Sequence, residues 1–389
     1  MAVFNGELRG GRRIYRVAGL ASVVLFYGVV AAMYLRPSHY DPTMFICNGA
    51  RWGIQEIAPL KLWAASEVGY DGQFYYAMGL RPFDLDAIRK HVDLPGYRYQ
   101  RILIPLLGHL LSFGEPKAVH VAMLLASFAL VLAATWVFME WFHWRHAGWG
   151  WALLFPLFPG TVHSLLRLTP DAPAAALALI GCYLWAREKT RSAAVALSLA
   201  LLARETMILI PVGLAIHAAW RRDFRRLAPL AIPVAACAIW LLVVRHLFGG
   251  FPFRQAGGNL VSPMSGIVDG YFRNRHMIAE RRSVFIKIGV FNLMVVAQFL
   301  LIASLAIGDS VRGAAGPFGP VLVLLVVLTL CLSGETWEYE WSITRVVLPV
   351  ALFYLIHALE NGLRPRDKIV NALTIPTVWF MLNWMNLRF

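Results

Sequence analysis

Long apolar runs separated by short basic clusters are the feature that most limits how this chain can fold. Hydrophobic residues make up 59% of the 389 residues and charged residues only 15%, whereas soluble domains are closer to half apolar and a quarter charged. No hydrophilic stretch is long enough for a separate soluble domain. We therefore expect an all-α polytopic membrane protein, with residues 1–389 forming one membrane-embedded domain of about 9–11 transmembrane or re-entrant helices.

The positive charges indicate how the chain is oriented. A net charge of +14 is also typical of nucleic-acid-binding proteins, but here the basic residues lie in short clusters between apolar runs, as the positive-inside rule describes. We therefore expect no nucleic-acid partner, a surrounding lipid bilayer, a multi-pass location in the bacterial plasma (inner) membrane and a cytoplasmic N-terminus. Basic residues before 17–35 resemble a signal peptide, but no small-residue cleavage site follows, so this run is predicted to stay as the first span.

The lengths of the apolar runs predict where the chain crosses the membrane, because one helical crossing needs about 20 apolar residues. Predicted crossings are 17–35, 117–139, 149–166, 172–186, 227–248, 288–307, 317–332, 346–359 and 369–386. Residues 36–100 and 249–287 are predicted as the first and second external loops, and 102–113 as an interfacial segment. A loop as long as 36–100 is usually functional.

Residues 192–220 do not fit a single crossing, because basic residues flank both ends. A straight helix of this length would measure about 43 Å and would place one basic flank on the wrong side. A re-entrant hairpin with its tip at 203–206 keeps both flanks on one side. Polar backbone at membrane depth is tolerated only beside protein or water, so the tip is predicted to line a cavity.

The stretch "GYDGQFYYAMGL" (69–80) places one carboxylate, Asp71, among three tyrosines. An aspartate followed by glycine commonly caps a helix or begins a turn. The alternative is a carboxylate that aromatic side chains hold at the membrane surface and desolvate, so that it can act as a general base. Both interpretations stay open at this point.

Arg98 and Arg101 lie three positions apart in "GYRYQRILIPLL" (96–107). On a helix this spacing places both side chains on one face. They are either interfacial arginines that extend toward the headgroups or a pair of guanidiniums that clamps a phosphate or diphosphate. The interleaved tyrosines and glutamine favour phosphate binding.

Arg204 and Glu205 lie inside a long apolar segment, where charged side chains are costly and mark functional sites by default. Sequence neighbours do not face each other on a helix, so their partners must come from elsewhere, such as Asp171 or Glu338. Asp171, in "LTPDAP", is predicted as the N-cap of the following helix and as a candidate near the same site.

Several other polar and aromatic residues carry weaker signals. His163 and Arg167 are one helical turn apart and are predicted to line one cavity. Trp337, Tyr339 and Trp341 are typical of an interfacial aromatic belt, although such rings also stack on sugars. The chain has no P-loop, GxSxG or HExxH motif and no cysteine or histidine spacing typical of a metal site, so a nucleotide-driven enzyme is not expected.

Three stretches resemble a family of membrane enzymes. "YDGQFYYAMGLRPF" (70–83), followed by "GYRYQRILIPLL" (96–107), is similar to the acid-aromatic and proline-bearing motifs of the GPI-mannosyltransferase-like branch of the integral-membrane GT-C glycosyltransferases. The stretch from "LTPDAP" to "LARETMILIPVG" (168–213) resembles a recurrent helix hairpin of the same superfamily. Together these similarities cover about half of the chain.

The resemblance implies transfer of a sugar, a hexose or pentose, from a polyprenyl-phosphate-linked donor to a lipid, glycan or protein acceptor on the extracytoplasmic face, with inversion. Asp71 is then the catalytic base, although many members carry their acid soon after the first span, where Asp41 stands. No cofactor is certain, and Mg or Mn is open because metal dependence varies in the superfamily. Expected substrate-binding residues are Asp41, Tyr70, Gln73, Tyr76, Arg98, Arg101, Asp171, Arg204, Glu205 and Arg345.

Two other functions fit the same residues. A transporter or flippase of lipid-linked sugars would use a similar charged cavity, and a non-catalytic subunit of an envelope-assembly complex would leave the same composition. Broken helices at matching places in two halves would favour a transporter, but the sequence shows one such break, at 203–206. The glycosyltransferase is therefore the main hypothesis and the transporter its alternative.

Overall fold

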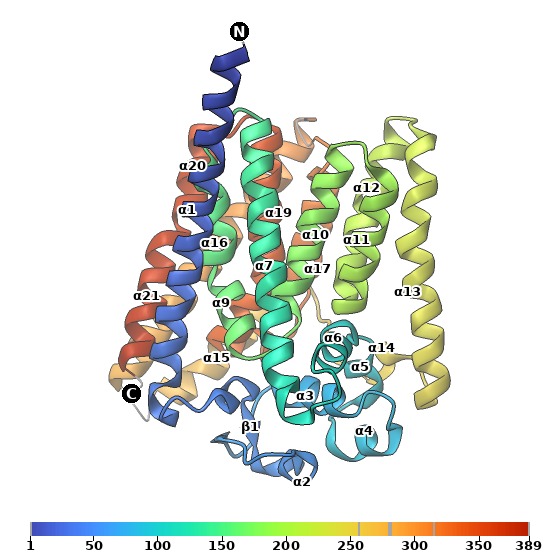
Figure 1. Ribbon diagram of the computed structural model, residues 1–389, viewed down its shortest axis with the longest axis vertical. Helices are drawn as coiled ribbons and strands as arrows, with labels where there is room; N and C mark the ends of the chain where they lie inside the picture. The colour runs from blue at the N-terminus through green and yellow to red at the C-terminus, as the bar shows by residue number, and fades with distance from the viewer. Residues whose placement is uncertain (1, 256, 279–281, 314–315, 388–389) are drawn as a thin grey trace.

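The structure is a computed structural model that describes residues 2–255, 257–278, 282–313 and 316–387. Almost all of it is α-helical, and its one sheet pairs two short strands, β1 (Asn48–Gly49) and β2 (Ala64–Ser66). The longer helices stand side by side, with the N-terminus at one end and the elements of residues 36–100 at the other (Figure 1). The expected all-α membrane architecture is confirmed.

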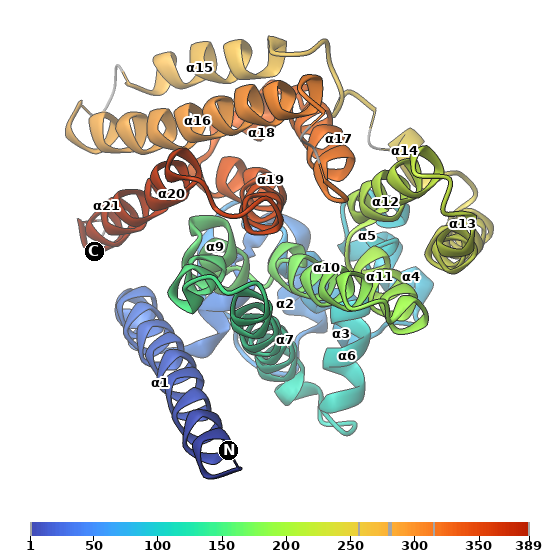
Figure 2. The same ribbon diagram turned by 90° about the horizontal axis from the view of Figure 1, so that it is seen from above.

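Five of the described helices are long and apolar enough to cross a membrane. They are α1 (Ala2–Leu35), α7 (Val119–Trp144), α13 (Leu227–Phe248), α16 (Arg282–Val311) and α19 (Glu340–Glu360). Their burial differs sharply: 83% of the apolar window in α19 is buried, against 17% in α13. Accordingly α19 lies in the centre of the bundle and α13 at its edge (Figure 2), so a polar residue on α19 faces protein.

Four further apolar helices are shorter than a full crossing. They are α10 (Asp171–Ala186), α11 (Thr190–Ala203), α12 (Leu209–Trp220) and α17 (Gly319–Leu330). At a rise of 1.5 Å per residue, a helix the length of α12 extends only about 18 Å, while the hydrocarbon core is about 30 Å thick. The predicted set of 9–11 helices is therefore a mixture of full-length and partial spans.

The predicted break at 203–206 is confirmed. Helix α11 ends at Ala203, Arg204 has an extended backbone, and a short 3-10 turn over Glu205–Ile208 leads into α12. Pro211 lies in the first turn of α12, where its missing N–H breaks no helical hydrogen bond. Both arms run toward the N-terminal end of the bundle, and their other ends stop above α5 and α6 (Figure 1).

Short elements fill the end opposite the N-terminus. Besides the strands they include α2 (Ile54–Ile57), α3 (Gly72–Leu80), α4 (Leu85–His91), α5 (Pro95–Tyr99) and α6 (Leu103–Leu111). The start of α3 approaches the end of α9 (Pro159–Leu166) so closely that a Cβ atom at Gly72 would clash with the carbonyl oxygen of Arg167. Glycine at this position therefore allows the contact that places Asp71 beside α9.

Two predicted spans were wrong. Residues 149–166 are not one span but a 3-10 turn, α8 (Leu154–Leu157) and α9, because Pro156 and Pro159 interrupt the helix. The predicted span 369–386 is divided between α20 (Pro365–Ala372) and α21 (Thr374–Leu387).

The second predicted loop, 249–287, contains α14 (Pro252–Gln255), α15 (Ser265–Ile278) and the first residues of α16; residues 256 and 279–281 lie outside the described chain. The described part of helix α16 already includes Arg282, before the predicted start at Ile288, because a helix can continue past its apolar part wherever its backbone bonds can form. Figure 2 shows α15 lying along the outer side of α16.

Candidate functional site

Alternating carboxylates and guanidiniums form a buried cluster where the first loop meets α9, α10 and α19. Each charged group in this row contacts the next one within ion-pair distance. We call it the loop-end cluster; its row is Asp93, Arg98, Asp71, Arg345, Asp171 and Arg204, with the pair Arg101 and Glu205 beside it.

Asp71 lies at the centre of the row. It directly precedes α3, yet its side chain makes no capping hydrogen bond to that helix. One carboxylate oxygen lies 3.1 Å from a guanidinium nitrogen of Arg98, and the other lies 3.2 Å from both terminal nitrogens of Arg345. Burial alone would raise the pKa of Asp71, but the neighbouring Arg98 and Arg345 hold it below its ordinary value. Asp71 is therefore an ionised carboxylate, held by arginines rather than by the expected tyrosines.

Arg345 joins the loop to the helix bundle. From the first turns of α19, it donates to Asp71 and also, over 3.2 Å, to a carboxylate oxygen of Asp171. The prediction that Asp171 is an N-cap was wrong, because Pro170 occupies the cap position and Asp171 is the first residue of α10. Its carboxylate instead pairs with Arg345 and Arg204, in a place where the helix N-terminus also favours negative charge.

Arg204 and Glu205 point to different partners, as predicted for sequence neighbours. Arg204 pairs with Asp171, whereas Glu205 accepts two hydrogen bonds from Arg101, at 2.7 and 2.6 Å. Arg101 also donates to the hydroxyl of Tyr97 at 2.6 Å. The break between α11 and α12 is therefore fastened both to α10 and to the first loop.

Arg98 and Arg101 do not form the expected two-arginine clamp. Helix α5 ends at Tyr99, so Arg101 lies in the turn that follows it. Arg98 donates to both oxygens of Asp93, at 2.8 and 3.1 Å, and contacts Asp71, whereas Arg101 binds Glu205. Each guanidinium is already paired with a carboxylate in this structure.

An aromatic wall adjoins the cluster. The guanidinium of Arg167, at the end of α9, lies 5.1 Å from the ring centre of Tyr70 and 4.1 Å from that of Trp341. The guanidinium of Arg345 lies 4.8 Å from the centre of the same Tyr70 ring. Burial raises the pKa of Tyr70 to about 12. Tyr339 stacks on Trp341 with ring centres 5.7 Å apart. These rings therefore cover protein cations and do not form a simple lipid-facing belt.

Arg167 was not among the predicted substrate-binding residues. The sequence nevertheless offers the same evidence for Arg167 as for Arg204, because each is a charged residue that directly follows an apolar stretch. His163, expected to share its cavity, lies 2.8 Å from the hydroxyl of Thr344. Trp337 is buried and packs on Phe299, with ring centres 5.6 Å apart.

Three expected substrate-binding residues have other contacts. Asp41 accepts a hydrogen bond from the backbone of Thr43 at 2.8 Å and so caps a 3-10 turn. Gln73 is buried and joins the backbones of Gly49 and Val68, each over 2.9 Å. Tyr76 is fully buried against His120, so it too lies within the packing of the loop.

A second buried polar cluster lies at the N-terminal end of the bundle. We call it the helix-end cluster; it consists of Asp309, His357, Arg364, Arg366 and Asp367. Asp367 accepts from the backbone N–H and side chain of Arg364, each at 3.0 Å, in a capping box at the start of α20. Asp309, near the end of α16, pairs with both arginines and lies 3.3 Å from His357.

Metal binding and similarity to other proteins give no further guide to the site. Within the described residues no group of three or more His, Cys, Asp and Glu side chains is placed to hold a metal ion. Comparisons of the chain with family models, with curated proteins and with solved structures find no match. A function must therefore be inferred from the geometry of the loop-end cluster.

Proposed function

We propose that this chain is a membrane glycosyltransferase that moves a sugar from a polyprenyl-phosphate-linked donor to an acceptor hydroxyl at the loop-end cluster, with inversion. The observation that carries the proposal is the double ion pair of Arg345, which binds both Asp71 and Asp171. A guanidinium that binds two acids can exchange one of them for a phosphate, while the other acid holds the guanidinium in place. The resemblance of 70–83 and 96–107 to GT-C motifs supports the same reaction.

Of the two acids that bind Arg345, Asp71 is the more exposed. Its side chain is 21% exposed, whereas that of Asp171 is 2% exposed. The phosphodiester of the donor carries one negative charge, as a carboxylate does, and it can form bidentate bonds with arginine. We therefore expect the donor phosphate to replace Asp71 on Arg98 and Arg345, with Asp171 holding Arg345 from behind.

This exchange would turn Asp71 into a base. Without its arginines, a buried carboxylate has a raised pKa and takes a proton more readily. In the proposed step, the acceptor oxygen bonds to the anomeric carbon while its proton passes to Asp71. The bond from that carbon to the phosphate oxygen breaks, and its electron pair leaves with the phosphate, whose charge Arg98 and Arg345 stabilise. A phosphate is a weak base, so its departure needs no general acid.

Neither a metal nor a cofactor takes part in this scheme. The acids of the loop-end cluster are paired with arginines, and the described residues offer no set of three ligands for Mg or Mn. In this scheme the side chains of Arg98 and Arg345 are the cations that stabilise the leaving phosphate.

The proposal also includes an orientation. The N-terminus and the basic connections would be cytoplasmic, and the loop-end cluster would face the extracytoplasmic side of the plasma membrane. Cysteine-accessibility labelling tests this: a cysteine at Glu338 should react from outside, and Arg222→Cys should react only after the membrane is opened. Labelling of Arg222→Cys from outside would contradict the orientation.

The reaction is tested by mass spectrometry of lipid-linked glycans from cells with the wild-type chain, without it, and with Asp71→Asn. We expect cells without the chain, and cells with the variant, to accumulate a glycan one sugar shorter. If all three profiles agree, the transferase is excluded. A full-length glycan held on the cytoplasmic face would instead identify the transporter or flippase.

A further inference from the structure

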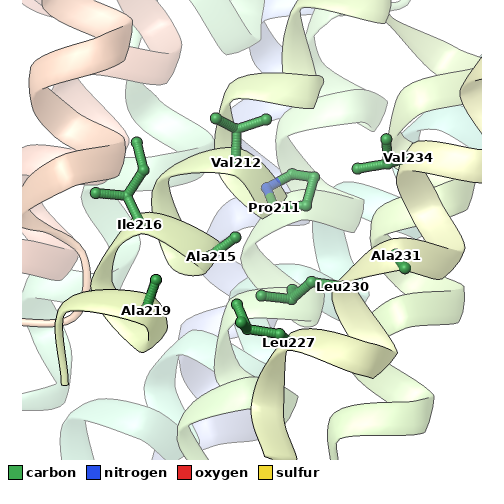
Figure 3. Close-up of a pocket in the computed structure, with 9 residues that line it drawn as sticks. All are labelled: Pro211, Val212, Ala215, Ile216, Ala219, Leu227, Leu230, Ala231 and Val234. Atoms are coloured by element: carbon green, nitrogen blue, oxygen red, sulfur yellow. The ribbon is translucent and has the colours of Figure 1, made fainter. Parts of the chain in front are cut away.

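Two grooves flank α12 and meet at one of its residues. One, between α12 and α13, has a volume of about 460 Å³ (Figure 3). The other, of about 700 Å³, lies between α12 and the region where α16 and α17 meet. Ile216 lines both grooves, so α12 forms a ridge between two cavities.

The first groove has the chemistry of a hydrocarbon site. All of its lining side chains are apolar, and Ala215, Ala219 and Ala231 leave room between the two helices (Figure 3). It extends along α12 from Pro211 to Ala219, about 12 Å, which is close to the depth of one bilayer leaflet, about 15 Å. A lipid chain therefore matches it in both polarity and length.

The second groove combines an apolar wall with a polar end. Pro320 and Leu324 of α17 form part of the wall, whereas His217, Trp220 and Arg221 lie at the C-terminal end of α12. The Trp220 side chain is 80% exposed. Tryptophan and arginine at the end of an apolar helix are typical of the headgroup level of a bilayer.

The charge at this end favours an anion. The turn after α12, residues 221–226, contains four arginines, of which Arg226 pairs with Glu188 and Asp223. Arg221 lines the groove, and Arg225 is exposed in the same turn but does not line it. Clustered basic residues beside an apolar surface attract anionic lipid headgroups.

We propose that an anionic phospholipid with two acyl chains straddles α12, with its phosphate at Arg221 and one chain in each groove. This occupant is favoured by the apolar lining of the first groove, the apolar wall of the second, their junction at Ile216 and Arg221 at the polar end. The site lies at the end of the bundle opposite the loop-end cluster, so it stands independently of the proposed glycosyltransferase activity.

Native mass spectrometry of the purified full chain tests the headgroup. With added phosphatidylglycerol or phosphatidylcholine, wild type should retain phosphatidylglycerol preferentially. Reversing one charge near the membrane surface, in Arg221→Glu, should lower that retention roughly 5- to 30-fold, whereas Arg225→Glu should change it much less. Equal retention of the two lipids, or equal losses in the two variants, would overturn the proposal.

The binding of acyl chains in the grooves is tested with a substitution that fills one of them. Leu324→Trp should block the second groove and reduce retention of phosphatidylglycerol, while Val327→Trp, at a residue 51% exposed on the same helix, serves as the control. A single-chain lysophosphatidylglycerol should bind more weakly than the two-chain lipid to wild type. If one-chain and two-chain lipids bind equally, or if wild type retains no lipid, the straddling arrangement is wrong.

Discussion

The two buried polar clusters use the same groups in different ways. In the helix-end cluster, Arg364 and Asp367 are three residues apart, the arginine side chains are about one-third exposed (34% and 33%), and the bonds fasten helix ends. In the loop-end cluster, Arg345 is 10% exposed and meets acids 174 and 274 residues away. Ion pairs whose arginines stay partly hydrated stabilise a fold at low cost. Arginines that are themselves buried and come from distant segments are costly and are typical of functional sites.

The largest effect should come from Asp171, the most buried acid of the loop-end cluster. Asp171→Asn leaves Arg345 and Arg204 buried with one carboxylate fewer, and breaking such a pair costs roughly 3–5 kcal/mol. Asp309→Asn is the matched change in the helix-end cluster, where both arginines also contact water and Asp367, and should cost roughly 1–3 kcal/mol. Denaturation of both variants in detergent measures the difference. Equal losses would mean that the two clusters have the same structural role.

Measurements of sugar transfer should distinguish the roles of the two acids that contact Arg98. Asp71→Asn should reduce sugar transfer roughly a hundredfold or more, the usual scale for removing a positioned base, and this corresponds to about 2.7 kcal/mol. Asp93→Asn also removes a carboxylate from Arg98, but Asp93 has no contact with Arg345 among the ion pairs of the described residues, so transfer should stay close to wild type.

Asp41→Asn is the second control for Asp71, because Asp41 is the rival acid. Its carboxylate caps a turn, so we expect little loss of transfer. A dead Asp41→Asn variant together with normal turnover in Asp71→Asn would move the base to Asp41. Normal turnover in both variants would favour the transporter over the enzyme.

A change of arginine to lysine should have a smaller effect on binding. Arg101→Lys keeps the charge but loses the bidentate contact with Glu205. We expect donor affinity to fall roughly tenfold, the cost of one lost charge-assisted bond, with the fold intact. Titration with polyprenyl phosphate measures this, and Arg366→Lys in the helix-end cluster is the control that should bind normally. Unchanged affinity in Arg101→Lys would mean that the Arg101–Glu205 pair does not support the donor site.

The smallest expected effect is on the free energy of unfolding at low pH. Because Arg98 and Arg345 lower the pKa of folded Asp71, its ionised form stabilises the fold at every pH above the unfolded value, about 4. That contribution is lost as pH falls through and below this value, by about 1 kcal/mol between pH 4 and pH 3. The gap in unfolding free energy between wild type and Asp71→Asn should therefore be constant from pH 5 to pH 8 and shrink below pH 4. A gap that widens in acid would contradict the ion pairs.

Hydropathy and the cost of buried charge were enough to predict the helical membrane fold, the break at 203–206 and a distant partner for Arg204, with Asp171 as one of two candidates. Each depends on a local pattern or on a group that must find a partner. The role of Asp171 was misread, because an acid before a helix has the same sequence pattern whether it caps the backbone or binds a distant cation. Prolines inside 149–166 interrupted a run whose hydropathy alone predicted one span.

Contacts between distant segments of the bundle could not be predicted from the sequence. Nothing local to Asp71 shows that Arg345, 274 residues later, will lie against it, because tertiary packing brings them together. The same holds for Arg167, which two aromatic rings cover from different parts of the chain. Spacing predicts which residues share a helix face but not which faces meet.

The short hairpin of α11 and α12 has a consequence for the surrounding lipids. A wall about 18 Å high stands against hydrocarbon about 30 Å thick, so the bilayer there meets a hydrophobic mismatch. Accommodating it costs fractions of a kcal/mol per ångström, through local thinning or a tilt of the protein. Thinning on this side would lower the lipid surface toward Arg204 and shorten the distance that a lipid-borne phosphate travels to reach it. The thickness of the host membrane would then influence how closely a lipid-borne phosphate approaches Arg204. This influence would act through elastic deformation of the lipids and would need no bound ligand.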